Sequence, residues 1–223
     1  MRINRLVAGT VTAGLLGLTP IAIAAPSHAT ENLTTTTVAT PSATEVEYGD
    51  DIYISVDVDA SNGSSAYRGT STLYAMEAGS TAWAPVATGT SASSTFFDVK
   101  PKINTTYKVV YSGYAATSTY EDNYAASESA PFTVGVARKI TYPSSGFVLK
   151  GKVTPNYGKK KIVIKVSKKQ NKGFKGFKTI KTNKAGKYRV TLPKRGGTWY
   201  WSFTVKGDAK YLGTGFVWKT WVS

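Results

Sequence analysis

The sequence predicts an all-β protein made of two tandem β-sandwich domains that follow an N-terminal leader. Three observations lead to this class. Apolar and polar residues alternate over several short runs, and clusters of turn-forming residues separate those runs. No segment after the leader has a helical period. The charge of the chain also changes sharply near residue 137, which divides it into two modules, residues 30–137 and residues 138–223.

Residues 1–29 have the pattern of a secretory signal peptide. Two arginines provide the positive start, residues 6–25 are apolar and small, and residues 27–29 (Ser-His-Ala) offer a cleavage site between small residues. An uncleaved membrane anchor is the alternative, but the apolar run contains Pro20 and no stop-transfer cluster follows it. We therefore expect a mature protein that is not membrane-spanning and is secreted, extracellular or loosely associated with a cell wall.

The mature chain lacks the residues on which most catalytic systems depend. It has no cysteine, and the only histidine, His28, belongs to the leader. The mature chain therefore cannot form a Ser-His-Asp or Cys-His nucleophile or one of the usual zinc sites. The first module has enough acids to form a glycosidase site that uses carboxylates alone. The second module has one acid, Asp208, and cannot supply a carboxylate pair. We expect no enzyme, no catalytic residue, no cofactor and no metal site.

The first module contains one very regular run, residues 51–59. Its even positions are aliphatic and its odd positions are polar or tyrosine, which is typical of a half-buried antiparallel strand. The turn cluster Ser61-Asn62-Gly63 follows it. The residues expected to face the core are Ile52, Ile54, Val56 and Val58.

The second module contains three such runs, separated by turn clusters at residues 183–186 and 195–197. In each run, large apolar residues occupy every second position, so one face of each strand should be buried. The residues expected to face the core are Ile162, Ile164 and Val166, then Tyr188, Val190 and Leu192, then Trp199, Trp201, Phe203 and Val205.

The two modules also repeat one another weakly. Residues 83–88 parallel residues 177–182, since each segment has an aromatic residue followed three positions later by a β-branched aliphatic. In each module a proline also precedes the aromatic residue of a later strand by six positions. These pairs are Pro101 with Tyr107 and Pro193 with Trp199. A common order and spacing indicates two copies of one fold.

At this level the chain resembles the bacterial immunoglobulin-like repeat domains of secreted and surface proteins of actinobacteria. The resemblance covers residues 33–223, and it implies two immunoglobulin-like β-sandwich domains. It depends on the segments 34–38, 46–49, 70–74 and 107–113 in the first module and 148–155, 177–182 and 185–188 in the second. The chain departs from this family in its long polar insert, Tyr114 to Pro131, and in its lysine content. Such motifs are structural, so the resemblance implies a fold rather than an activity.

Charge gives the main indication of function. Residues 30–137 hold 12 acidic and 4 basic side chains, whereas residues 138–223 hold 22 basic side chains and one acid. Such a module attracts anions over long distances, and an anionic cell-wall polymer or another extracellular polyanion is the expected partner. Only three of the 22 basic residues are arginines, and bidentate recognition of anions depends on the arginine side chain. Diffuse attraction is therefore favoured over bidentate recognition. The alternative is that these lysines only protect sheet edges and aid solubility. The predicted polyanion-binding residues are Lys159, Lys160, Lys161, Lys168, Lys169, Lys172 and Lys175.

A carbohydrate-binding module is the alternative function, because exposed aromatic rings stack on sugars. Alternation assigns Trp199, Trp201 and Phe203 to the core and leaves Tyr200, Trp218 and Trp221 as candidates for stacking. A purely structural protein whose charged halves attract one another is a third alternative.

Two features of the first module are open to more than one interpretation. Six acids fall within residues 45–59, and a solvated acidic face is favoured over a calcium site, because their spacing matches no calcium loop. The insert, Tyr114 to Pro131, is either a recognition loop or a variable connection. The six acids are Glu45, Glu47, Asp50, Asp51, Asp57 and Asp59.

Overall fold

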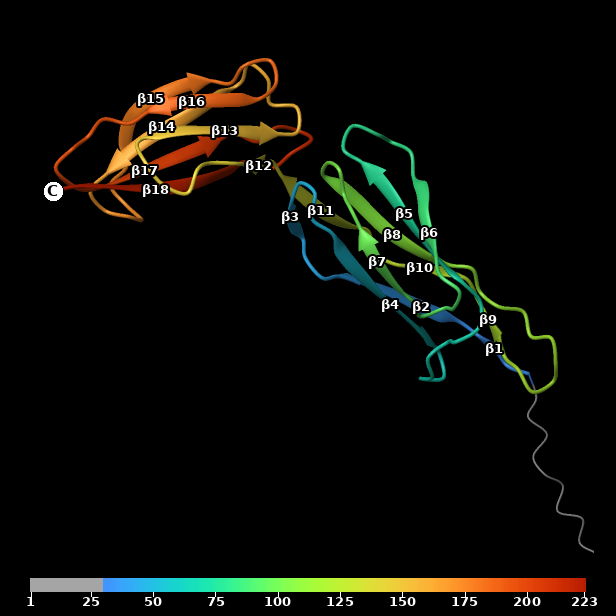
Figure 1. The fold of residues 1–223 in the computed structure, drawn as a ribbon. Coiled ribbons are helices and arrows are strands. Elements are labelled where there is room, and N and C mark those ends of the chain that lie inside the picture. The colour runs from blue at the N-terminus through green and yellow to red at the C-terminus, as the bar shows by residue number, and fades with distance from the viewer. Residues whose placement is uncertain (1–29) are drawn as a thin grey trace, which may run out of the picture.

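The computed structural model describes residues 30–223, so the predicted signal peptide lies outside the described residues. In this part of the chain the regular elements are eighteen strands, β1 to β18, and the all-β prediction is confirmed (Figure 1). Among the described residues there is no helix of the length and apolarity that crossing a membrane requires.

The N-terminal sandwich encloses its core between two sheets. One sheet has the order β2-β4-β7, and the other has the order β3-β11-β8-β5-β6, with β10 also pairing with β8. The inner faces of both sheets contribute to one cluster of buried residues, which includes Ile54, Leu73 and Val109. The strands are β2 (Thr35–Pro41), β3 (Glu45–Glu47), β4 (Ile52–Ala60), β5 (Ser71–Glu77), β6 (Ala84–Thr88), β7 (Thr95–Val99), β8 (Thr105–Tyr111), β10 (Ser127–Glu128) and β11 (Phe132–Ala137).

The C-terminal sandwich has the sheets β12-β13-β16 and β15-β14-β17-β18. Its core is a separate cluster rich in aromatic rings, among them Trp201 and Phe203, which are fully buried. The strands are β12 (Lys139–Ile140), β13 (Val148–Thr154), β14 (Lys161–Ser167), β15 (Lys175–Lys181), β16 (Lys187–Thr191), β17 (Gly197–Val205) and β18 (Thr214–Val222).

Both sandwiches follow one strand plan. In the second, the first, second and fifth strands form one sheet, while the third, fourth, sixth and seventh form the other. In the first, β2 and β3 share the role of first strand, and the remaining order is the same. This is the Greek-key plan of immunoglobulin-like sandwiches, so the predicted fold class is confirmed. The segments paired as repeats from sequence occupy equivalent strands, namely β6 with β15 and β8 with β17.

The inward faces also agree with the alternation seen in the sequence. Residues 52, 54, 56 and 58 of β4 are buried while their neighbours are exposed. The same holds for Ile162 and Ile164 of β14 and for Tyr188 and Val190 of β16. Val166 and Trp199 are partial exceptions, because both are only partly buried against the core.

The long insert of the first sandwich is ordered. It contains β9 (Asn123–Tyr124), which pairs in parallel with β1 (Asn32–Leu33) at the end of the molecule away from the C-terminal sandwich (Figure 1). Glu121 holds the preceding turn, because its carboxylate accepts hydrogen bonds from the backbone N of Thr117 at 3.0 Å and from the hydroxyl of Tyr114 at 2.8 Å. These bonds, first the one from the Thr117 backbone, lower the pKa of Glu121 to about 2.

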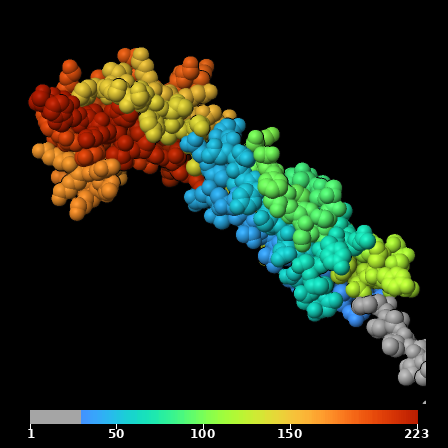
Figure 2. Space-filling model, turned by 60° about the horizontal axis from the view of Figure 1, so that its bottom comes forward, coloured from blue at the N-terminus to red at the C-terminus, as the bar shows by residue number. Residues whose placement is uncertain are grey.

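The two sandwiches follow one another end to end (Figure 2). The turn between β17 and β18 docks on the N-terminal sandwich, since the backbone N of Leu212 donates to the carbonyl of Val136 at 2.8 Å. The backbone N of Asn104 donates to the carbonyl of Lys210 at 2.9 Å. Leu212 packs closely on Gly135, since a Cβ there would come within 2.5 Å of its Cδ1 unless the leucine side chain shifted.

Arg138 follows the last residue of β11 beside this contact, which we call the joint, and is 1% exposed. Its Nη2 donates to Oδ2 of Asp208 at 2.6 Å, and its Nε donates to the carbonyl of Pro155 at 3.0 Å. The guanidinium also lies over the Tyr211 ring, 4.2 Å from its centroid. A buried cation held by one carboxylate makes the joint sensitive to the loss of Asp208.

Candidate polyanion interface

The seven lysines predicted to bind polyanions are all exposed, but they form two groups rather than one patch. Three stand at or just before the start of β14, and we call Lys159, Lys160 and Lys161 the junction group. Four stand in the β14–β15 turn or at the start of β15, and we call Lys168, Lys169, Lys172 and Lys175 the turn group. Because a strand rises about 3.3 Å per residue, the length of β14 separates the groups by roughly 20 Å.

The junction group lines a hollow of about 490 Å³, which we call the lysine hollow. Two further lysines that the sequence analysis missed, Lys181 and Lys206, also line it. Lys181 ends β15 directly opposite Lys161 in the antiparallel register, and Lys206 follows the last residue of β17. Five lysines from three places in the chain thus converge on one concave surface beside the joint.

The lysine hollow contains one carboxylate, Asp208. Burial acts to raise the pKa of Asp208, but hydrogen bonds from Arg138 at 2.6 Å and Lys160 at 3.0 Å outweigh it and hold that pKa well below its usual range. The charge of Asp208 is therefore already shared by two cations. Within residues 30–223, the ion pairs include no carboxylate partner for Lys159, Lys161, Lys181 or Lys206.

Like charges also face each other across the other sheet of this sandwich. On the outward face of β13 and β16, Lys150 lies opposite Arg189, and Lys152 lies opposite Lys187. Directly opposed like charges destabilise an antiparallel pair by a few tenths to about 1 kcal/mol. Lysine clusters along the chain do not predict this face, because its cations lie in two strands that are distant in the sequence. The sequence does contain a signal for this charged face, because cations alternate with apolar or small residues in both strands.

The aromatic candidates for sugar stacking divide between the two faces of one sheet. Trp221 is 65% exposed, and Tyr200 is partly exposed. The prediction of Trp218 as a stacking residue is wrong, because Trp218 is only 8% exposed and its indole Nε1 donates to the carbonyl of Gly146 at 3.0 Å. The register of β17 and β18 explains the difference, since Trp218 pairs with the buried Trp201 on the inner face, whereas Trp221 pairs with Thr198.

The acids of the first module form no metal-binding group. Asp57 and Asp59 lie on the outward face of β4, and Glu47 pairs with Lys139 at 2.9 Å. Among residues 30–223, no group of three or more Asp, Glu, His or Cys side chains is arranged to hold an ion. This arrangement agrees with a solvated acidic face.

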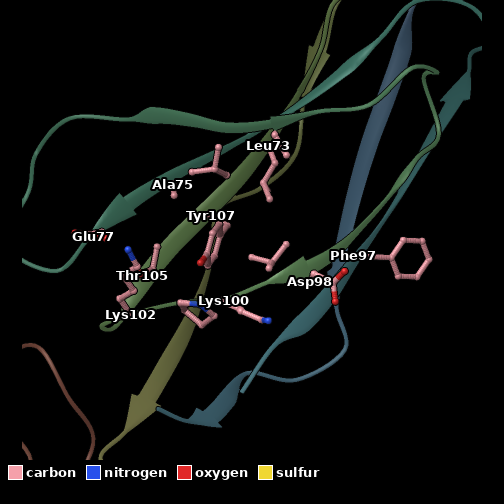
Figure 3. Close-up of a pocket in the computed structure, with 13 residues that line it drawn as sticks. Leu73, Ala75, Glu77, Phe97, Asp98, Lys100, Lys102, Thr105 and Tyr107 are labelled. Atoms are coloured by element: carbon pink, nitrogen blue, oxygen red, sulfur yellow. The ribbon is translucent and has the colours of Figure 1, made fainter. Parts of the chain in front are cut away.

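A second hollow, of about 360 Å³, opens into the side of the N-terminal sandwich (Figure 3). Leu73, Ala75 and Tyr107 line its inner part, and burial raises the pKa of Tyr107. Figure 3 shows its two carboxylates, Glu77 and Asp98, at opposite ends of the view. They are therefore not placed side by side as a catalytic pair.

Comparison with protein-family models found no match, and comparison with curated proteins found none either. Several solved structures align with the chain at low identity. The human OSCAR ligand-binding domain is 11% identical over 85% of this chain and 99% of its own length, with a TM-score of 0.25. The chicken CNTN1 FN1–FN3 domains are 11% identical over 84% of this chain and 65% of theirs, with a TM-score of 0.29.

An Escherichia coli alpha-2-macroglobulin fragment spanning domains NIE–MG1 is 10% identical over 81% of this chain and 96% of its own, with a TM-score of 0.25. Similarities this distant imply nothing about ligands. The strand order alone identifies the architecture: the chain is a tandem pair of immunoglobulin-like β-sandwiches.

Proposed function

We propose that this chain is a secreted, non-enzymatic protein of the actinobacterial immunoglobulin-like type, and that its C-terminal sandwich binds an anionic polymer outside the cell. The lysine hollow carries the proposal. Five lysines converge there, and its one carboxylate already serves Arg138 and Lys160. An anionic group entering the hollow would meet four lysines without a carboxylate partner among the described residues, namely Lys159, Lys161, Lys181 and Lys206.

The distribution of charge favours a polymer over a small anion. Cations occupy the lysine hollow, the turn group and the outward face of β13 and β16, so a long ligand could contact several of these surfaces at once. Screening limits each exposed charge to roughly 8 Å at physiological ionic strength, so clustered lysines contribute far more than scattered ones. The alternative is that the lysines serve to attract the acidic sandwich. This explains them less well, because Lys139 with Glu47 is the one exposed ion pair found between the described parts of the two sandwiches.

Two variants of equal charge change would test the hollow. One replaces Lys161, Lys181 and Lys206 with Gln, and the other replaces Lys168, Lys169 and Lys172 with Gln. Lys160 is left intact because it also contacts Asp208. Binding of wall teichoic acid and of polyphosphate would be measured over a salt series. We expect the first variant to weaken binding more and to make the salt slope shallower by about 0.7–0.9 per lost phosphate contact.

Thermal melts of both variants would show that the fold is intact, since all six side chains are exposed. Equal weakening by the two variants would mean that binding is diffuse and that the hollow is not the anchor. If the unaltered protein bound neither polymer at physiological salt, the proposed function itself would be wrong.

A further inference from the structure

The outward face of the four-stranded sheet β15-β14-β17-β18 combines two kinds of side chain that the sequence did not place together. Paired residues of antiparallel strands point to the same side, so the register identifies this face. Ile164, Phe203 and Phe216 form one inward row. Lys165, Ser202 and Val217 form the adjacent outward row, and Val217 is 47% exposed.

Cations run along this outward face from its junction end toward its far end. Lys161 and Lys181 are opposite each other beside the lysine hollow, and Lys165 follows along β14. Lys219 lies opposite Tyr200 near the far end. All four lysines are exposed, and no acidic residue occurs in β14, β15, β17 or β18.

Trp221 lies at the far end of the same face, opposite Thr198. It is two positions beyond Lys219 and diagonal to Tyr200, which places the three side chains as neighbours on one sheet surface. From Thr204, which lines the lysine hollow, to Thr198 the strand extends roughly 20 Å. Hydroxyl groups of Thr198, Ser202 and Thr204 lie along the outward side of β17 between these two ends.

This combination points to a ligand that presents anions, hydroxyl groups and flat apolar ring faces along one chain. From it we propose, resting on the function above, that the polymer is an anionic polysaccharide extended across the outward face of β15-β14-β17-β18. Its phosphate, sulfate or carboxylate groups contact the lysine hollow and Lys165, and a sugar ring stacks on Trp221. A polyanion without sugars leaves the exposed indole unexplained, and a neutral glycan leaves the lysines unexplained.

Single-stranded nucleic acid combines anions with rings too, but its binding surfaces present several aromatic side chains on which successive bases stack. Here Trp221 and the partly exposed Tyr200 are the aromatic residues of the outward face, and the aliphatic Val217 and Val163 occupy positions nearer its junction end. The face therefore suits one stacked ring among hydroxyl and charged contacts better than a row of stacked bases.

The test compares four probes: dextran sulfate, neutral dextran, polyphosphate and oligo-dT. The variant is Trp221→Ala, and the control is Tyr120→Ala, which removes an 88% exposed ring from the insert of the other sandwich. We expect Trp221→Ala to weaken dextran sulfate binding about tenfold, equivalent to about 1.4 kcal/mol, and to leave polyphosphate binding unchanged. The control should change neither, and dextran should not bind.

The outcomes separate this inference from the function on which it rests. If Trp221→Ala left dextran sulfate binding unchanged, or weakened polyphosphate binding equally, the polysaccharide assignment would fail while polyanion binding stood. Tighter and more Trp221-dependent binding of oligo-dT would assign the face to nucleic acid instead. Dextran binding that depended on Trp221 and ignored salt would overturn both proposals in favour of a neutral carbohydrate module.

Discussion

The two sandwiches share a strand plan but handle charge in opposite ways. In the N-terminal sandwich, Arg68 pairs with Glu121 at 2.9 Å and Lys108 pairs with Glu128 at 2.8 Å. In the C-terminal sandwich, cations face cations across neighbouring strands. Outward positions do not affect the core, so one backbone plan tolerates both surfaces. The difference shows that outward residues and their register, not the strand plan, determine the surface charge of each sandwich.

The cores differ as well. Val109 of β8 and Trp201 of β17 occupy the position that the sequence repeat pairs, and both are fully buried. The C-terminal core contains further rings around Trp201. Phe177 meets Trp201 edge to face at 4.9 Å between centroids, and Phe203 stacks on Phe216 at 4.6 Å. The C-terminal module has 86 residues against 108 in the other, so fewer and larger side chains fill its core.

The largest expected effect comes from this core difference. Trp201→Ala should lower the free energy of unfolding of the C-terminal sandwich by about 3–5 kcal/mol, because it leaves a large cavity and an unpaired Thr220 hydroxyl. Val109→Ala should cost the N-terminal sandwich about 2 kcal/mol, because it removes two methyl groups. Urea unfolding followed by tryptophan fluorescence and circular dichroism would measure both. Equal losses would contradict the idea that large rings substitute for a longer chain.

The joint should give the next largest effect. Asp208→Asn leaves the buried Arg138 without its counter-charge, and because Asp208 is partly exposed we expect a loss of about 2–3 kcal/mol. The pKa of Asp208 is lowered in the folded protein, so its contribution is complete above the ordinary value of 3.8 and is lost as the pH falls further. Thermal melts at neutral and acidic pH should show a larger acid loss in the parent protein than in the variant, which keeps only other contributions such as that of Glu121.

Separating the sandwiches should have a smaller effect. We propose a domain boundary between residues 137 and 138, so residues 138–223 alone should unfold cooperatively. The fragment keeps Arg138 with Asp208 but loses the Leu212 contact with Val136. We expect the fragment to lose about 1 kcal/mol of its free energy of unfolding, which would lower its melting temperature by roughly 4–8 °C. A broad melt of the fragment would mean that the second sandwich depends on the first for its fold.

The smallest effect concerns the opposed cations. Lys187→Glu would place a carboxylate opposite Lys152 and should stabilise the C-terminal sandwich by about 0.2–1 kcal/mol. The same change should weaken binding of polyphosphate, since it removes positive charge from the outward face. Lys184→Glu, in the adjacent turn, is a control with the same change in charge and no cross-strand cation. Destabilisation by Lys187→Glu would show that the opposed lysines do not repel measurably.

The buried face of each regular strand and the division of charge along the chain could be predicted from the sequence. Alternation is a local property with a period of two residues, so Ile52 to Val58 and Ile162 to Ile164 identified their buried faces without knowledge of any partner strand. The charge boundary near residue 137 required only counting. The matching order and spacing of the two modules indicated two copies of one fold, and the resemblance to immunoglobulin-like repeat domains implied which fold it is.

Other features depended on the tertiary structure, because they depend on contacts between distant parts of the chain. The register of β17 and β18 buries Trp218 and exposes Trp221, and the final strand alone did not reveal it. The register of β14 and β15 brings Lys181 to Lys161, and the turn after β17 adds Lys206. Arg138 was one of 22 basic residues in the sequence, and folding placed it in a buried joint with Asp208. Sequence thus determined the outward residues of the strands that alternate clearly, while pairing between strands determined the faces of the final strand and which outward residues meet.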